Sequence, residues 1–69
     1  MTFSEHLLQL RKSRGLKQTE LAAQIGIHWR TYQTYERGER EPTLSTLIAL
    51  ADLYDLPLDE LACRKYPKR

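Results

Sequence analysis

Residues 18–38 of the chain, QTELAAQIGIHWRTYQTYERG, predict two short helices joined by a tight turn. Apolar residues recur at helical spacing through residues 18–25, and Gly26 stands where that helix would end. A second helix is predicted to begin near Trp29 and to end before Gly38. So short a connection cannot bring the second helix back antiparallel to the first. The two helices should therefore cross at a steep angle, as in a helix-turn-helix motif.

Two small residues in this stretch have predicted structural roles. Ala22 lies on the inner face of the first helix, where the helices approach most closely, and a larger side chain there would overpack the crossing. Gly26 opens the tight turn that sets the crossing. Both residues are expected to support the fold rather than to bind a ligand.

The N-terminal part of the chain predicts another helix. Thr2 and Glu5 have the spacing of a capping box, and apolar residues then recur at positions i, i+4 and i+7. Gly15 stands where a left-handed residue would end this helix. We therefore expect a helix over residues 3–14.

Two further helices are predicted after the helix-turn-helix. A fourth opens after Pro42 with Thr43 as its N-cap, and a fifth covers about residues 58–62, with acidic residues in its first turn that suit the helix dipole. One apolar face of the fourth helix is formed by Leu44, Leu47, Ile48 and Ala51. Because no segment alternates with period two, we expect a compact all-α domain of five helices over residues 1–62, followed by a basic C-terminal tail at residues 63–69.

A helical wheel divides residues 29–36 into two faces. Tyr32 and Tyr35 fall on one face and are expected to pack in the core. The opposite face carries donors and acceptors of the kinds that read base edges in a major groove, namely Arg30, Gln33 and Thr34. Trp29 lies at the border, where both packing in the core and contact with a groove remain open.

The charges are unevenly distributed, although the formal net charge is only +2. Residues 1–41 hold seven Lys or Arg against five Asp or Glu, and residues 63–69 hold four bases and no acid. Residues 42–62 hold four acids and no base. This separation of charge is compatible with a nucleic-acid partner for the basic parts and keeps the acidic segment away from it.

The composition argues against an enzyme, a metal site and a membrane segment. Cys63 is the sole cysteine and the two histidines are far apart in sequence, so neither a disulfide nor a zinc site is expected. The acidic residues between 52 and 60 have no histidine beside them and are expected to form a solvated surface. The N-terminus lacks a secretory signal, and the longest aliphatic run is far shorter than a membrane span. We expect a cytoplasmic protein that uses no cofactor and is associated with the nucleoid when bound.

Residues 18–42 resemble the helix-turn-helix core of the phage repressor and Cro family, also called Xre-like. They share Q-x-E-L-A, a central Gly, E-x-G and a following Pro. The helix that carries Arg11 resembles the family's first helix, and residues 44–62 resemble its fourth and fifth. The resemblance implies a lambda-repressor-like fold, with the helix-turn-helix at about residues 18–37 and the helix that begins at Trp29 in the major groove of double-stranded DNA.

The resemblance also implies roles for individual residues. Base contacts are implied for Trp29, Arg30 and Thr34, and the wheel adds Gln33. Phosphate contacts are implied for Gln18 and, around the rim, expected for Lys17, Arg11, Arg37 and Arg40. Arg11 is also expected to form a partly buried ion pair with Glu36 that ties the first helix to the end of the third.

The N-cap positions of two helices depart from the family pattern. His28 stands at the start of the third helix and Lys17 at the start of the second, where a small hydroxyl residue is usual. Neither His nor Lys is a preferred capping residue. We therefore expect these helix starts to use other hydrogen-bond partners, or these two side chains to contact phosphate instead of capping.

The function expected from these features is that of a sequence-specific DNA-binding transcriptional regulator. A repressor that binds a palindromic operator as a dimer fits best, with the dimer surface near the fourth and fifth helices. Two alternatives stay open. One is a DNA-binding antitoxin that also binds a toxin, and the other is a protein-interaction or coactivator module with little base readout.

Overall fold

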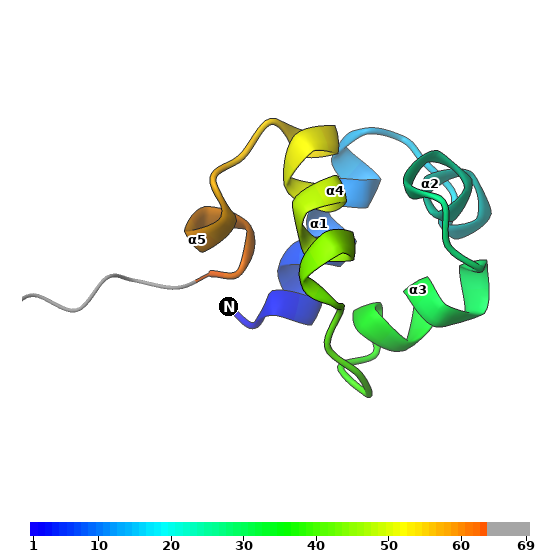
Figure 1. Ribbon diagram of the computed structural model, residues 1–69, viewed down its shortest axis with the longest axis horizontal. Coiled ribbons are helices and arrows are strands. Elements are labelled where there is room, and N and C mark those ends of the chain that lie inside the picture. The colour runs from blue at the N-terminus through cyan, green and yellow to red at the C-terminus, as the bar shows by residue number, and fades with distance from the viewer. Residues whose placement is uncertain (64–69) are drawn as a thin grey trace, which may run out of the picture.

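The computed structural model describes residues 1–63, which form five α-helices (Figure 1). In chain order they are α1 (Phe3–Ser13), α2 (Gln18–Ile25), α3 (Trp29–Glu36), α4 (Leu44–Tyr54) and α5 (Leu58–Leu61). The all-α class and the number of helices are confirmed within this part of the chain. The helices α1 and α5 each end one residue earlier than predicted, at their C-caps Arg14 and Ala62. The predicted basic tail lies outside the described residues, apart from Cys63.

Two helix starts use the side chains that the sequence places there. The Thr2 hydroxyl accepts a hydrogen bond from the Glu5 backbone N–H at 3.2 Å, and the Glu5 carboxylate accepts one from the Thr2 N–H at 2.8 Å. This is the reciprocal pairing of a capping box. The Thr43 hydroxyl likewise accepts from the Thr46 N–H at 3.3 Å at the start of α4. The predicted caps of α1 and α4 are therefore present.

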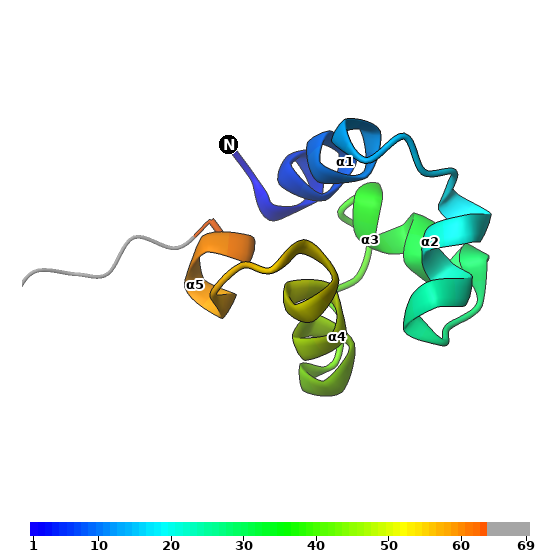
Figure 2. The same ribbon diagram turned by 90° about the horizontal axis from the view of Figure 1, so that it is seen from above.

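All five helices contribute side chains to the core, with α5 at one end of the molecule and α2 at the other (Figure 2). Its largest fully buried side chains are Tyr32, Leu7, Leu21, Leu50 and Leu61. Tyr32 and Tyr35 are both buried, with their rings edge to face at 6.4 Å between centroids. The prediction that these two tyrosines face inward is confirmed.

The buried face of α4 differs from the predicted apolar face. Leu44 and Ile48 are 67% and 43% exposed, whereas Leu50 and Tyr54 are buried. The helix carries apolar residues on more than one side, so the amphipathic pattern alone cannot choose between neighbouring stripes. Packing against α2 and α5 selects the stripe that contains Leu50 and Tyr54. The prediction was right for Ala51, which is buried, and for Leu47, which packs partly buried against the core, and wrong for Leu44 and Ile48.

A side chain of α1 holds the short helix α5 in place. The His6 Nδ1 lies 3.0 Å from the backbone carbonyl oxygen of Leu61, which can only accept, so Nδ1 carries the proton. Leu61 itself is fully buried.

None of the helices in residues 1–63 has the length and apolar character needed to cross a bilayer.

Enlargement of Ala22 should destabilise the domain, because this side chain is only 1% exposed on α2, a helix that packs against both α3 and α4. We expect Ala22→Leu to lower the free energy of unfolding by about 1 to 3 kcal/mol, the usual cost of overpacking. Urea unfolding followed by circular dichroism measures this change. Ala23→Leu is the matched control, since Ala23 is the exposed neighbour on the same helix. Equal stability of the two variants would contradict the prediction.

Candidate nucleic-acid interface

The helices α2 and α3 form the central structural unit of the candidate interface. Gly26 ends α2 in the left-handed region, with φ 76° and ψ 30°, a conformation that glycine adopts without strain. The Ile27 N–H then donates to the Ala22 carbonyl oxygen at 3.0 Å. In Figure 1, α2 is seen nearly end-on while α3 runs across the picture, so the two axes diverge widely. Gly26 thus ends α2 and opens the turn, and the Ala22 side chain is buried next to it.

The start of α3 is capped by His28 itself. Its Nδ1 accepts a hydrogen bond from the Arg30 backbone N–H at 3.1 Å, so this nitrogen carries no proton. The expectation that His28 would not cap was therefore wrong, because an imidazole nitrogen can take the place of a hydroxyl oxygen here. Lys17 agrees with the expectation. Its side chain makes no capping bond, and the Glu20 carboxylate instead accepts from the Lys17 N–H at 2.8 Å.

The first turn of α3 presents an exposed aromatic and cationic pair. Trp29 is 36% exposed and does not belong to the core cluster, and Arg30 is exposed beside it. The Arg30 guanidinium carbon lies 5.5 Å from the centroid of the Trp29 ring, and the His28 ring stacks on Trp29 at 6.0 Å between centroids. Trp29 is therefore a surface residue.

The other two outward residues predicted on α3 are half-buried and already engaged. The Thr34 hydroxyl donates to the Thr31 carbonyl oxygen at 2.6 Å. The Gln33 Nε2 donates to the Gln18 Oε1 at 3.4 Å. The outer face of α3 thus has an exposed N-terminal turn and a more restrained second turn.

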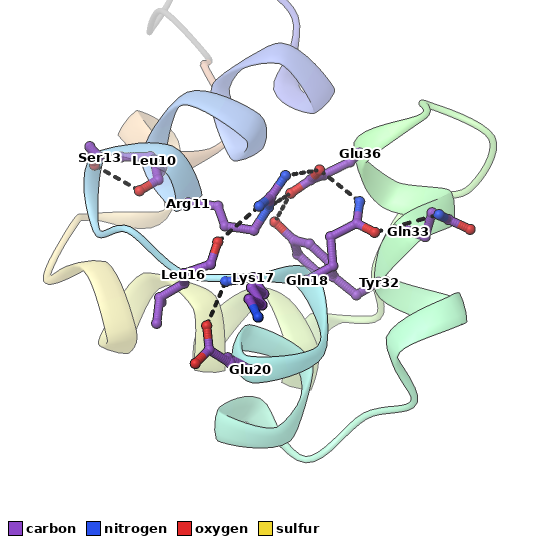
Figure 3. A network of polar contacts seen from close by, with 10 residues as sticks. All are labelled: Leu10, Arg11, Ser13, Leu16, Lys17, Gln18, Glu20, Tyr32, Gln33 and Glu36. Atoms are coloured by element: carbon purple, nitrogen blue, oxygen red, sulfur yellow. Dashed lines mark hydrogen bonds and ion pairs between the residues drawn. The ribbon is translucent and has the colours of Figure 1, made fainter.

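Four side chains form a hydrogen-bonded network around the partly buried carboxylate of Glu36 (Figure 3). Three of them donate directly. The Arg11 Nε and Nη2 donate to the two carboxylate oxygens at 2.6 and 3.1 Å. The Tyr32 hydroxyl donates to the same carboxylate at 2.5 Å, and the Gln18 amide donates to it at 3.0 Å. Gln33 joins through Gln18. The ion pair implied by the resemblance is present, and it belongs to a network that joins α1, α2 and α3.

The network shifts the pKa values of its members in opposite directions. Burial alone would raise the pKa of Glu36, but the hydrogen bonds from Arg11, Tyr32 and Gln18 outweigh it and leave that pKa below its ordinary value of 4.5. Burial, aided by the neighbouring Glu36, raises the pKa of Tyr32 far above its ordinary value. Glu36 is therefore ionised and Tyr32 neutral at physiological pH.

The contributions of Tyr32 and Gln18 to this network were not predicted from the sequence. The spacing of Tyr32 and Glu36, at i and i+4 on one helix, was a usable signal for the first. No sequence spacing relates Gln18 to Glu36, which meet only through the crossing of α2 and α3.

The predicted phosphate-contacting residues fall into two groups. Arg11 and Gln18 are half-buried, and the Arg11 Nη1 also donates to the Leu16 carbonyl oxygen at 2.9 Å. The fold therefore occupies most donors of these two side chains. The exposed residues are Lys17, Arg37 and Arg40, and none of them takes part in an ion pair within residues 1–63.

The crossing of α2 and α3, with α3 anchored through Glu36 and exposed at its first turn, defines a helix-turn-helix domain. A family profile described as helix-turn-helix matches residues 7–61. The chain belongs to this helix-turn-helix family, of the Cro/C1 or Xre type. The resemblance noted in the sequence is thereby confirmed.

Relatives with curated names and solved structures agree with this membership. The chain is 38% identical over 64 residues to the cryptic phage CTXphi transcriptional repressor RstR of Vibrio cholerae, covering 93% of the chain and 57% of the relative. A crystal structure of a transcriptional regulator from Listeria innocua superposes with a TM-score of 0.90 at 34% identity, covering 99% of the chain and 64% of that protein. The restriction-modification controller protein C.AhdI of Aeromonas hydrophila gives a TM-score of 0.78 at 34% identity, covering 86% and 89%. The chain spans about half the length of the curated relatives it matches.

Removal of the Glu36 carboxylate should unfold the domain more easily, because Arg11 would then lose both acceptors of its ion pair. We expect Glu36→Ala to cost about 3 to 5 kcal/mol in the free energy of unfolding, the usual result when one partner of a buried pair is removed. Thermal and urea unfolding measure the loss. Glu39→Ala is the matched control, since Glu39 is exposed and makes no ion pair within the described residues. A Glu36→Ala protein that melts with the parent would refute this assignment.

The same carboxylate should make stability depend on pH. Because the pKa of Glu36 is lower in the folded protein than its ordinary 4.5, its ionisation stabilises the fold above pH 4.5. This stabilisation is lost as the pH falls through the lowered value. The difference in unfolding free energy between the parent and Glu36→Gln should therefore narrow on acidification below pH 4.5. A constant difference across that range would show that Glu36 does not titrate as described.

Proposed function

We propose that the protein is a sequence-specific transcriptional repressor that binds a palindromic DNA operator as a homodimer. The observation that carries this proposal is the first turn of α3. There Trp29 and Arg30 are exposed on a helix whose opposite face is fixed in the core by Tyr32, Tyr35 and Glu36. A rigid helix with an outward arginine suits insertion into a major groove, because arginine binds the O6 and N7 atoms of guanine with two hydrogen bonds.

The individual roles proposed are those that the family resemblance and the helical wheel imply. The residues proposed to contact bases are Trp29, Arg30, Gln33 and Thr34. Those proposed to contact phosphates are Lys17, Gln18, Arg37 and Arg40, with Arg11 contributing chiefly through its hold on Glu36. Phosphate contacts position the protein on the duplex, whereas base contacts select the sequence. In this proposal the exposed cations supply phosphate contacts, and the outer face of α3 supplies base contacts.

Relatives support a regulatory role. One is named a phage transcriptional repressor and another a restriction-modification controller protein, and each is identical to the chain at a third or more of its aligned residues. The controller protein also shares this fold. With this role we also propose that the protein acts in the cytoplasm, at the nucleoid when bound. Nothing in residues 1–63 gathers three His, Cys, Asp or Glu side chains as a metal site would require.

The dimer surface is proposed to lie on α4 and α5. These helices carry the exposed apolar side chains Leu44, Ile48 and Leu58, at 67%, 43% and 40% exposure. Figure 1 shows α5 at the opposite end of the molecule from α2, so a partner bound there leaves the helix-turn-helix accessible. A twofold dimer would present two copies of α3 to half-sites about one helical turn apart, roughly 34 Å.

Selection from random DNA duplexes at two salt concentrations tests the proposal. We expect enrichment of a palindrome and a steep loss of affinity as salt rises. Arg30→Ala should cost about 1 to 3 kcal/mol of discrimination at one base pair of each half-site, because a bidentate contact is lost. Lys17→Ala should instead weaken all sequences alike and lower the salt slope by about 1. If no sequence is enriched, the protein-interaction alternative replaces the repressor, and capture of a toxin partner would favour the antitoxin alternative.

A charge placed on α4 tests the dimer surface. We expect Ile48→Glu to weaken self-association by at least about tenfold, because it would bury an unpaired carboxylate in an apolar contact. Sedimentation equilibrium measures the association constant. Gln9→Glu is the control, since it adds the same charge at an exposed position of α1. Unchanged association of the Ile48→Glu protein would move the dimer surface elsewhere.

A further inference from the structure

We infer that Trp29 and Arg30 read two adjacent base pairs as one unit. Arg30 binds a guanine, and Trp29 contacts the 5-methyl group of a pyrimidine in the neighbouring base pair. This inference rests on the proposed DNA binding and names the bases that the first turn of α3 selects. The ligand is a step of duplex DNA in which guanine lies next to a thymine or a 5-methylcytosine.

The side chains of the two residues are already in contact in the protein alone. The Arg30 guanidinium carbon lies 5.5 Å from the centroid of the Trp29 ring, within the range of a cation–π interaction. No ion pair engages Arg30 anywhere in residues 1–63, so its donors remain available to a base. An arginine that is held against a ring has fewer orientations to lose when it binds guanine. The contact therefore favours the bidentate arrangement before DNA arrives.

The separation of the two groups is long enough to span from one base pair to the next. A guanidinium that makes two hydrogen bonds to guanine lies close to the plane of that base. Successive base pairs are about 3.4 Å apart along the duplex. An indole ring centred 5.5 Å from the guanidinium carbon thus overlaps the level of the next base pair, because the ring extends to either side of its centre. Trp29 and Arg30 should therefore act at neighbouring positions of the sequence.

The chemistry of Trp29 selects a methyl group at that position. Its ring is an exposed apolar surface, and the apolar feature of base edges in the major groove is the 5-methyl group of thymine. Cytosine lacks this group until it is methylated at carbon 5, and then it presents the same methyl at the same place. The pair should therefore respond to the methyl group itself, whether thymine or 5-methylcytosine supplies it.

His28 serves as a positioning residue for this pair. Its Nδ1 accepts from the Arg30 backbone N–H, and its ring stacks on Trp29 with 25° between the ring planes. The His28 side chain thus contacts both residues, Arg30 through the capping hydrogen bond and Trp29 through ring stacking. This arrangement restricts the indole without covering it, since Trp29 stays 36% exposed.

Removal of single methyl groups from the DNA tests the inference without altering the protein. In the operator obtained by selection, each thymine is replaced in turn by deoxyuridine, and binding is measured by fluorescence anisotropy. We expect one thymine per half-site, directly beside the guanine that depends on Arg30, to lose about threefold to fourfold in affinity, the amount expected for one buried methyl group. Replacing that base pair by 5-methylcytosine and guanine should bind more tightly than the unmethylated cytosine pair by a similar factor.

Protein variants assign the effect to Trp29. In Trp29→Ala the penalty for deoxyuridine should disappear, whereas Trp29→Phe should keep part of it, and thermal unfolding checks that both variants fold. Deoxyuridine at thymines away from the Arg30-dependent guanine is the internal control. The inference is overturned if no thymine beside that guanine responds, or if the penalty persists in Trp29→Ala. The repressor proposal survives either result as long as an operator is enriched and depends on Arg30, so the two failures are distinguishable.

Discussion

The partly buried carboxylate of Glu36 is the constraint on which the arrangement of the first three helices depends. It accepts hydrogen bonds from Arg11 on α1, Gln18 on α2 and Tyr32 on α3 itself. A buried charge needs several donors to offset the loss of water, and here each donor comes from a different helix. The orientation of α3 is therefore fixed by electrostatics at its C-terminal end and by the buried tyrosine rings along its length. Its first turn is left to face outward.

Sequence reasoning identified the features that depend on local rules. The five helices, the caps at Thr2 and Thr43, and the inward face of α3 follow from capping preferences and helical periodicity, which act over a few residues. The family pattern supplied the pairing of Arg11 with Glu36, which separation along the chain would hide. These features could be predicted because the local preferences and the fold agree.

The wrong prediction for the buried face of α4 arises where tertiary packing decides between locally equivalent choices. On α4 both the stripe through Ile48 and the stripe through Leu50 are apolar, and contacts with α2 and α5 choose the second. The helical wheel likewise did not decide whether Trp29 packs in the core or faces a groove. Its exposure follows from its place as the first residue of α3, beside His28. The capping by His28 was missed because statistical preferences rank residue types, while the hydrogen bond depends on the position of one ring nitrogen.

The link from Gln33 through Gln18 to Glu36 divides the outer face of α3 into two regions with different freedom to evolve. A substitution at Gln33 disturbs a side chain that also serves the interior, so a new binding preference there carries a risk to the fold. Trp29 and Arg30 have no such tie to the core. Substitutions at Trp29 and Arg30 should therefore be the first to change the DNA sequence that related proteins prefer. Such changes alter the first turn of α3 and leave the fold intact.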